Sequence, residues 1–152
     1  MAMDLDAVRT GFPVAVPMVA TLGLEFVELS YDRAVLRMPD QKAYHNHVAG
    51  PHAGAMFTLA ESASGALVLA NFGDRLGEAT PLAVEATIRY RRLAKGDVRA
   101  EATMSRSAGE ILDELGRGLR PEFDVPVVLS TDDGTVTGEM TVRWTLRPNR
   151  AD

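Results

Sequence analysis

The spacing of apolar side chains changes once along this chain, near residue 81, and the change separates a helical region from a region of strands. Residues 53–71 are small or apolar with one charged exception, which predicts a helix that is apolar nearly all round and therefore buried. After residue 81, apolar and polar side chains alternate, as in strands with one buried face. The apolar positions of this alternation are Val84, Ala86, Ile88 and Tyr90, then Val98, Ala100, Ala102 and Met104, and finally Val142, Trp144 and Leu146.

In chain order, the predicted elements are a helical segment within residues 1–20, strands 24–31 and 33–39, a polar loop 40–52, the helix 53–71, strands that begin at residues 81 and 98, a short helix over 108–115, and strands 123–131 and 135–146. Pro13 and Pro17 keep the first segment short and interrupted. Gly73 is placed to end the long helix. Gly96-Asp97 and Asp133-Gly134 fit turns, and the second pair is a strong signal for a tight hairpin.

This order predicts an α+β fold in which a curled antiparallel sheet of about five or six strands wraps round one long buried helix. No repeat or long linker divides residues 1–152, so we expect a single domain with one hydrophobic core. The helix is nearly long enough to cross a bilayer, but Glu61 near its middle would cost about 2.5–3.5 kcal/mol there. We therefore expect a core helix of a soluble protein.

Composition narrows the functional classes. The net charge of −5 and the pI near 5.2 argue against a nucleic-acid-binding surface, which needs clustered basic residues. The absence of cysteine excludes disulfides, thiol nucleophiles and thiolate metal sites. The N-terminus lacks a basic-then-apolar export signal, so the cytoplasm is the expected location.

Glu61 is the one charged residue between positions 53 and 71. A buried carboxylate is costly unless it is paired, hydrogen-bonded or protonated, and burial raises its basicity, as a general base requires. Just upstream, a polar loop contains Asn46 and all three histidines, His45, His47 and His52. We interpret Glu61 and this loop as an active site, with a structural ion pair of Glu61 as the alternative.

The histidines of the loop are not expected to bind a metal, because no second cluster of acids or cysteines accompanies them. His52 is expected to fix the loop through a hydrogen bond. Asn46 either binds a substrate carbonyl or satisfies loop backbone groups, and the sequence favours neither.

The motif Asn46-x5-His52-Ala-Gly54-x6-Glu61 resembles that of the hotdog-fold thioesterases, most closely the phenylacetyl-CoA type and a branch with His-Ala-Gly in place of His-Gly-Gly. The similarity covers most of the chain, including the turn over residues 89–98. The resemblance implies that Glu61 acts as nucleophile or as general base on water. It also implies that the backbone N–H of Ala53 polarises the thioester carbonyl, while Asn46 and His52 shape that oxyanion site.

Three departures from the family pattern accompany the resemblance. Many relatives have Asp where Glu61 stands, so the carboxylate reaches one methylene further. The first glycine after the histidine is Ala53, which narrows the approach to its N–H. Relatives often have Ser or Thr one turn beyond the acid, whereas position 65 is glycine, so only Ser62 or Ser64 could assist.

The resemblance implies acyl-CoA as the substrate and no other cofactor. The basic residues Arg91, Arg92 and Lys95 would then contact coenzyme A phosphates, although a solvated strand end explains them equally well. Other residues expected to bind substrate or shape the acyl pocket are Gly54, Met56, Phe57 and the segment 108–120.

Two other functions fit the same pattern. Hydroxyacyl dehydratases of this fold have a loop histidine fourteen residues before the helix acid, and His47 and Glu61 have that separation. The chain could also bind acyl-CoA without catalysis.

A homo-oligomer, either a dimer or a dimer of dimers, is expected for a geometric reason. Ala53 and Glu61 lie ~12 Å apart along one helix, whereas a thioester carbon must lie ~3 Å from both an oxyanion donor and the attacking group. The loop of one chain is therefore expected to face Glu61 of a partner.

Overall fold

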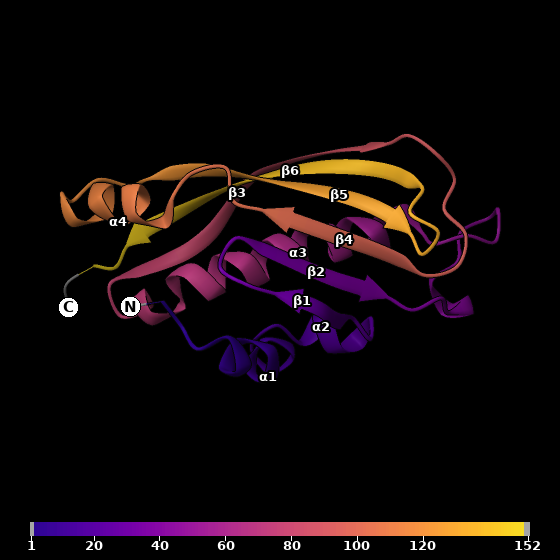
Figure 1. Cartoon of the computed structure of the whole chain (residues 1–152), viewed down its shortest axis with the longest axis horizontal. Helices are drawn as coiled ribbons and strands as arrows, with labels where there is room; N and C mark the ends of the chain where they lie inside the picture. The colour runs from indigo at the N-terminus through magenta and orange to yellow at the C-terminus, as the bar shows by residue number, and fades with distance from the viewer. Residues whose placement is uncertain (1, 151–152) are drawn as a thin grey trace.

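Helix α3, Ala53–Phe72, runs between a six-stranded antiparallel sheet and the N-terminal helix α1 (Figure 1). This computed structural model describes residues 2–150. Residues 62–68 of α3 are buried without a break, which is nearly two full turns, so every side of this half of the helix is covered. The first half is more open, because Ala53 and Gly54 are exposed. The predicted buried helix is confirmed, and its limits differ from the prediction by one residue.

The sheet contains strands in the order β1-β2-β4-β5-β6-β3, and every neighbouring pair is antiparallel. The strands are β1 Glu25–Leu29, β2 Arg33–Met38, β3 Ala79–Tyr90, β4 Val98–Thr103, β5 Glu122–Thr131 and β6 Val136–Pro148. The predicted α+β class and hotdog-like wrapping are therefore confirmed, and the expected five or six strands are six, although the sheet does not close on itself. The Asp133-Gly134 hairpin is confirmed as well, with Gly134 at φ 85°.

The Gly96-Asp97 turn joins strands that are not neighbours. Strand β3 pairs with β6 at one edge of the sheet, from Ala79 opposite Pro148 to Tyr90 opposite Gly138, whereas β4 lies between β2 and β5. The chain therefore crosses from the edge to the middle of the sheet through residues 91–97. The outer edge of β3 has no strand partner among residues 2–150.

The short helices are α1 Leu5–Ala15, α2 Pro17–Thr21, α4 Ala108–Gly116 and the 3-10 turns η1 Lys42–Tyr44 and η2 Gly73–Arg75. As predicted, the N-terminal helix is interrupted, but the break comes at Val16, before Pro17, while Pro13 lies inside α1. As predicted, α3 ends at Gly73, although Gly73 has a right-handed conformation and not the left-handed one that favours glycine. A Cβ at Gly73 would meet the sulfur of Met3, which lies on a flexible side chain.

A hydrogen bond to Ser64 ties α3 to the sheet, and a second one within the helix orients the Ser64 hydroxyl. The indole N–H of Trp144 on β6 donates to Ser64 Oγ at 3.0 Å, and the Ser64 hydroxyl donates to the Glu61 carbonyl at 2.7 Å. Thr145, on the face of β6 opposite Trp144, is also buried, and its hydroxyl accepts from Arg120 Nε and donates to the Pro121 carbonyl. The helix from Ala53 to Arg75 has the length and apolarity of a membrane span, but most of it is buried within the protein, as in a core helix.

Gly50 provides a test of how the polar loop is held against the rest of the fold. A Cβ at this position would lie 2.6 Å from the Ala94 carbonyl oxygen, a backbone atom that has little freedom to move. We expect Gly50→Ala to lower the free energy of unfolding by about 1–3 kcal/mol, because the close contact forces a backbone shift. Urea denaturation measures this change. Gly11→Ala is the control, since its Cβ would meet nothing within 4 Å; equal stability of both variants would contradict the prediction.

Candidate active site

Glu61 is half-buried on α3, and its carboxylate has no hydrogen-bond or ion-pair partner among residues 2–150. Burial raises the pKa of the Glu61 carboxyl above its ordinary value. The other carboxyls with shifted pKa values, those of Asp97, Glu101, Asp133 and Glu139, are shifted downward, mainly by hydrogen bonds that they accept. Glu61 is therefore the carboxyl group that is desolvated and has no partner to stabilise its charge, as is typical of a general base.

The Glu61 pocket is a cavity of about 290 Å³ between α3, the end of α1 and the start of β3. Its lining consists of Phe12, Val16, Glu61, Gly65, Val68, Leu69, Leu76, Thr80, Pro81 and Trp144. The one hydroxyl among them belongs to Thr80 and donates to Asn149 Oδ1 at 2.8 Å. Glu61 is consequently the sole ionisable group in an otherwise apolar wall.

The N-terminus of α3 presents backbone N–H donors at the surface. His52 caps the helix, because its Nδ1 accepts from the Gly54 N–H at 2.8 Å, and it thus forms a hydrogen bond at the junction of loop and helix. Within residues 2–150 the N–H of Ala53 has no acceptor. Tyr90, at the end of β3, donates its hydroxyl to the Ala53 carbonyl at 2.8 Å and so anchors the first turn to the sheet. An exposed helix N-terminus with a free donor favours developing negative charge.

Asn46 holds the loop in shape. Its side-chain oxygen accepts from the N–H groups of Val48 and Gly50, both at 3.1 Å, and its side-chain nitrogen donates to the Pro51 carbonyl at 3.3 Å. Ala49 between them has φ 56°, an unusual conformation for a residue with a Cβ. Of the two interpretations of Asn46, the structure supports the satisfaction of loop backbone groups.

The remaining histidines lie apart from Glu61. His45 Nε2 is 2.7 Å from Asp40 Oδ1, and His47 is exposed at the loop. His47 does not line the Glu61 pocket, so a single chain does not form the dehydratase pair of His47 and Glu61. The described residues contain no group of three or more His, Cys, Asp or Glu side chains arranged to hold a metal ion.

Several predicted site residues take other positions. Ser64 is fully buried with its hydroxyl engaged by Trp144 and the Glu61 backbone, and Ser62 is buried beside it. Met56 and Phe57 do not line the Glu61 pocket, and neither does the segment 108–120. Helix α4 lies at the end of the sheet opposite the polar loop (Figure 1).

Sequence reasoning placed Glu61 in the site but missed the other residues that line its pocket, among them two at the end of α1, Phe12 and Val16. These two are four residues apart, the spacing of one helix face, and this was the available signal.

The basic residues proposed for coenzyme A phosphates are partly engaged. Arg91 forms an ion pair with Glu139, and Lys95 Nζ donates to the Val48 carbonyl at 2.7 Å. Arg92 is exposed, and its backbone N–H donates to Thr137.

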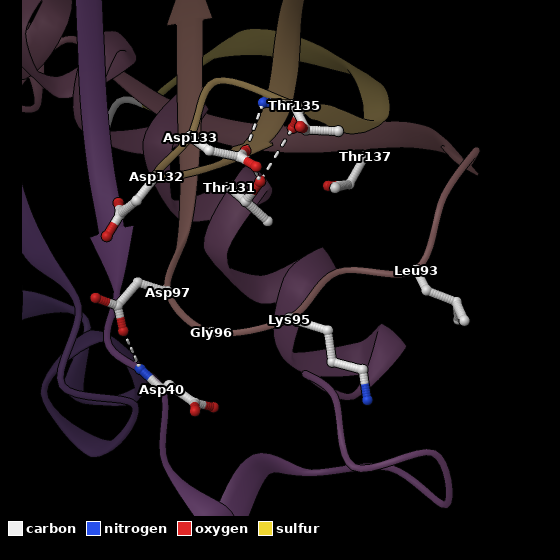
Figure 2. Close-up of a pocket in the computed structure, with 10 residues that line it drawn as sticks. All are labelled: Asp40, Leu93, Lys95, Gly96, Asp97, Thr131, Asp132, Asp133, Thr135 and Thr137. Carbon is white, nitrogen blue, oxygen red and sulfur yellow. Dashed lines mark hydrogen bonds between the residues drawn. The ribbon is translucent and has the colours of Figure 1, made fainter.

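Lys95 also lines a second, open hollow of about 600 Å³, shown in Figure 2, whose lining includes four aspartates. Each aspartate is committed: Asp97 to Arg37 and the Asp40 N–H, Asp133 to Thr131 and Thr135, Asp132 to Arg99, and Asp40 to His45. This hollow shares no lining residue with the Glu61 pocket.

One chain therefore does not bring the two halves of the expected site together. The Glu61 pocket contains none of Asn46, His52 and Ala53. The helix itself separates Ala53 from Glu61 by ~12 Å along its axis, which is four times the reach of an attacking group. Any catalysis that uses both ends needs a second chain.

Glu61→Gln tests whether the buried Glu61 carboxylate lacks a partner that stabilises its negative charge. Because burial raises the pKa of Glu61 in the folded state, protonated Glu61 favours folding, and this contribution is lost as the pH rises through the raised pKa. At pH 7 the ionised carboxylate opposes folding, so the Gln variant should have the higher Tm. The difference should shrink toward about pH 4, where the wild-type carboxyl is also neutral. Thermal unfolding across this pH range is the measurement. A Gln variant less stable than wild type at pH 7 would indicate a favourable ion pair of Glu61 instead.

Comparison with known proteins places the chain among thioesterase-like structures. A protein of unknown function from Pseudomonas aeruginosa, described as a "Probable Thioesterase", has 32% sequence identity and a TM-score of 0.84, with 98% of this chain and 99% of that chain covered. A thioesterase family protein from Silicibacter pomeroyi has 21% identity and a TM-score of 0.75, with 96% and 100% covered. The PaaI protein of the E. coli phenylacetic acid degradation operon has 13% identity and a TM-score of 0.74, with 97% and 94% covered.

Nothing among curated proteins matches the sequence. The sequence profile of one family, described as "Domain of unknown function (DUF4442)", matches residues 6–146. The predicted resemblance to hotdog thioesterase-family proteins, including the phenylacetic acid type, is confirmed at the level of fold. The chain thus belongs to the DUF4442 family and has the hotdog fold of thioesterase-family proteins.

Proposed function

We propose that this protein hydrolyses the thioester bond of an acyl- or aryl-CoA, with Glu61 as the reacting carboxylate. The observation that carries the proposal is the position of Glu61, unpaired and desolvated in the wall of an apolar pocket of acyl-group size. The Pseudomonas aeruginosa relative, described as a probable thioesterase and similar over nearly its whole length, supports the same activity.

Glu61 serves the reaction in its ionised form. As general base it takes a proton from water while the water oxygen attacks the thioester carbon. As nucleophile its oxygen attacks that carbon directly, and water then hydrolyses the mixed anhydride. In both routes the C–S bond breaks, coenzyme A leaves as a thiolate that gains a proton, and the acyl group leaves as a carboxylic acid. Desolvation raises the basicity of Glu61 and favours either step.

The N-terminus of α3 supplies the oxyanion site. The carbonyl oxygen becomes negative as the bond forms, and preorganised N–H donors stabilise that charge. The Gly54 N–H is already occupied by His52, so the free Ala53 N–H is the proposed donor. Tyr90 fixes the orientation of the Ala53–Gly54 peptide group by binding its carbonyl. Arg92 and Lys95, near the same end of the molecule, are the proposed contacts for coenzyme A phosphates.

A two-fold dimer would join the two parts of the site. Strand β3 runs beside α3, since its start lines the Glu61 pocket through Thr80 and Pro81 and its end reaches Ala53 through Tyr90. The outer edge of β3 is unpaired along twelve residues in the described part of the chain. Antiparallel pairing of this edge with its copy places the Tyr90 end of one chain beside the Pro81 end of the other. The Ala53 N–H of one chain then faces Glu61 of its partner.

Glu61→Gln should lower thioester hydrolysis by at least about 100-fold, because Gln cannot accept a proton or attack the carbonyl. Release of coenzyme A from octanoyl-, phenylacetyl- and butanoyl-CoA, followed by thiol titration, measures the rate. Glu110→Gln on the exposed side of α4, which does not line the Glu61 pocket, is the matched control and should retain wild-type activity. Near wild-type turnover by the Glu61→Gln protein would show that Glu61 is a structural residue and would contradict the proposed mechanism of hydrolysis.

Ala53→Pro tests the oxyanion donor alone. Proline lacks the N–H, is well tolerated in the first helical position, and suits the extended His52 that precedes it, at φ −63° and ψ 141°. We expect about 10²–10³-fold lower kcat with little change in Tm. Ala53→Gly keeps the N–H and should remain active.

The same variant tests the shared site. After exchange of subunits between inactive Glu61→Gln and Ala53→Pro proteins, each heterodimer holds one intact site. A random mixture should recover about a quarter of wild-type activity, because half of the dimers are mixed and each has one working site of two. Verified exchange without any recovered activity would exclude the shared site.

A further inference from the structure

Gly65 stands one helical turn after Glu61 and faces the same cavity. We propose that Gly65 sets the depth of the Glu61 pocket and that this pocket binds an uncharged, apolar acyl group of aryl or medium-chain size. The inference rests on the proposed hydrolysis of acyl-CoA and names its substrate class.

No close contact requires a glycine at position 65. A Cβ there would lie 3.6 Å from two ring atoms of Trp144 and 3.7 Å from Phe12, which is ordinary van der Waals contact. By contrast, a Cβ at Gly50 or Gly138 would lie 2.6 or 2.7 Å from a backbone oxygen, so those positions exclude any side chain. Glycine inside a helix is unfavourable because it loses the most backbone entropy on folding. Helix α3 therefore has glycine, a poor helix former, at a position where alanine would fit. The absence of the alanine methyl group leaves additional space in the pocket.

The walls on both sides of that space are held in place. Phe12 packs edge-to-face on Phe26, with ring centroids 5.9 Å apart, and is 4% exposed. The Trp144 indole is fixed by its hydrogen bond to Ser64. The cavity is therefore preformed rather than opened by rotation of a side chain, as is usual for small-molecule sites.

The lining selects the chemical class of the occupant. Apart from Glu61 and Thr80, whose hydroxyl is engaged by Asn149, the wall is hydrocarbon or aromatic. The lining contains no cation to bind a terminal carboxylate, and Glu61 would repel one. An engineered apolar cavity of about 150 Å³ binds benzene, so a volume of about 290 Å³ takes a phenyl group with a short linker or a saturated chain of similar bulk. Coenzyme A itself stays outside.

Trp144 reports occupancy directly, because it is the sole tryptophan of the chain and lines the cavity. The first measurement follows quenching or a spectral shift of Trp144 fluorescence during titration with neutral alcohols. The probes are 1-octanol and benzyl alcohol, and butanol is the smaller comparison probe. Wild-type protein should bind octanol and benzyl alcohol. Gly65→Ala should weaken their binding by about 10-fold, the scale on which one methylene-sized change in a hydrophobic pocket discriminates.

The second measurement is the specificity of hydrolysis. In Gly65→Ala the KM for octanoyl- and phenylacetyl-CoA should rise by about 10-fold, while butanoyl-CoA is hydrolysed within about 2-fold of the wild-type rate. Val16→Phe, which narrows the pocket from the end of α1 and leaves α3 unchanged, should produce the same selective loss. Gly109→Ala, an exposed helical glycine with open space around its Cβ, is the control and should alter neither binding nor specificity. Gly65→Ala should also have a Tm equal to or above that of wild type, because alanine favours the helix.

The outcomes separate this inference from the proposed function. Octanol binding that depends on position 65, in a protein that hydrolyses no thioester, would overturn the hydrolase and support the pocket as an apolar binding site. Hydrolysis with no fluorescence response to any probe, or with an unchanged chain-length profile in both Gly65→Ala and Val16→Phe, would overturn the role of Gly65. A uniform loss across all substrates would also overturn it, since that result indicates general damage to the site.

Discussion

The structure depends on the burial of one helix that is apolar on every side. A sheet covers only one side of α3, so the rest of the helix needs other cover. Helix α1 provides this cover for the second half, where residues 62–68 are fully enclosed, whereas the first turn of α3 stays exposed within a single chain. Glu61 lies at the boundary between the enclosed and the open half. Its carboxylate is desolvated for that reason, and yet it can be reached from the cavity beside α1.

The direction of β3 relative to α3 links the fold to the two parts of the site. Contacts at both ends of the strand, Pro81 beside Glu61 and Tyr90 beside Ala53, show that the edge of the sheet follows the length of the helix. A long unpaired edge is a feature that proteins normally protect. Pairing with a second copy would protect it and, in an antiparallel arrangement, would exchange the two ends. The same constraint thus accounts for an exposed edge and for a site that is incomplete in one chain.

Sequence reasoning succeeded where the signal was local. The helix 53–71, the six strands and the Asp133-Gly134 hairpin follow from side-chain period and turn chemistry, and each lies within a few residues of the prediction. It failed where contacts join distant segments. The pairing of β3 with β6, and the wall that Phe12 contributes to a pocket on α3, have no local signature. The function of Asn46 was undecided for a related reason, because its amide can serve the loop or a ligand equally well until the backbone of residues 48–51 is in place.

Glu61 and Gly65 are exceptions to the rules that the rest of α3 obeys. One places an unpaired carboxylate in a buried helix, and the other places a glycine where alanine fits, so each reduces stability without a compensating contact among the described residues. Local rules are usually broken at functional sites, since elsewhere a better residue is available at no cost. These two exceptions are independent in their chemistry, one of charge and one of volume. They lie one turn apart and line the same cavity, and this coincidence is the strongest reason to regard the cavity as the place where a substrate binds.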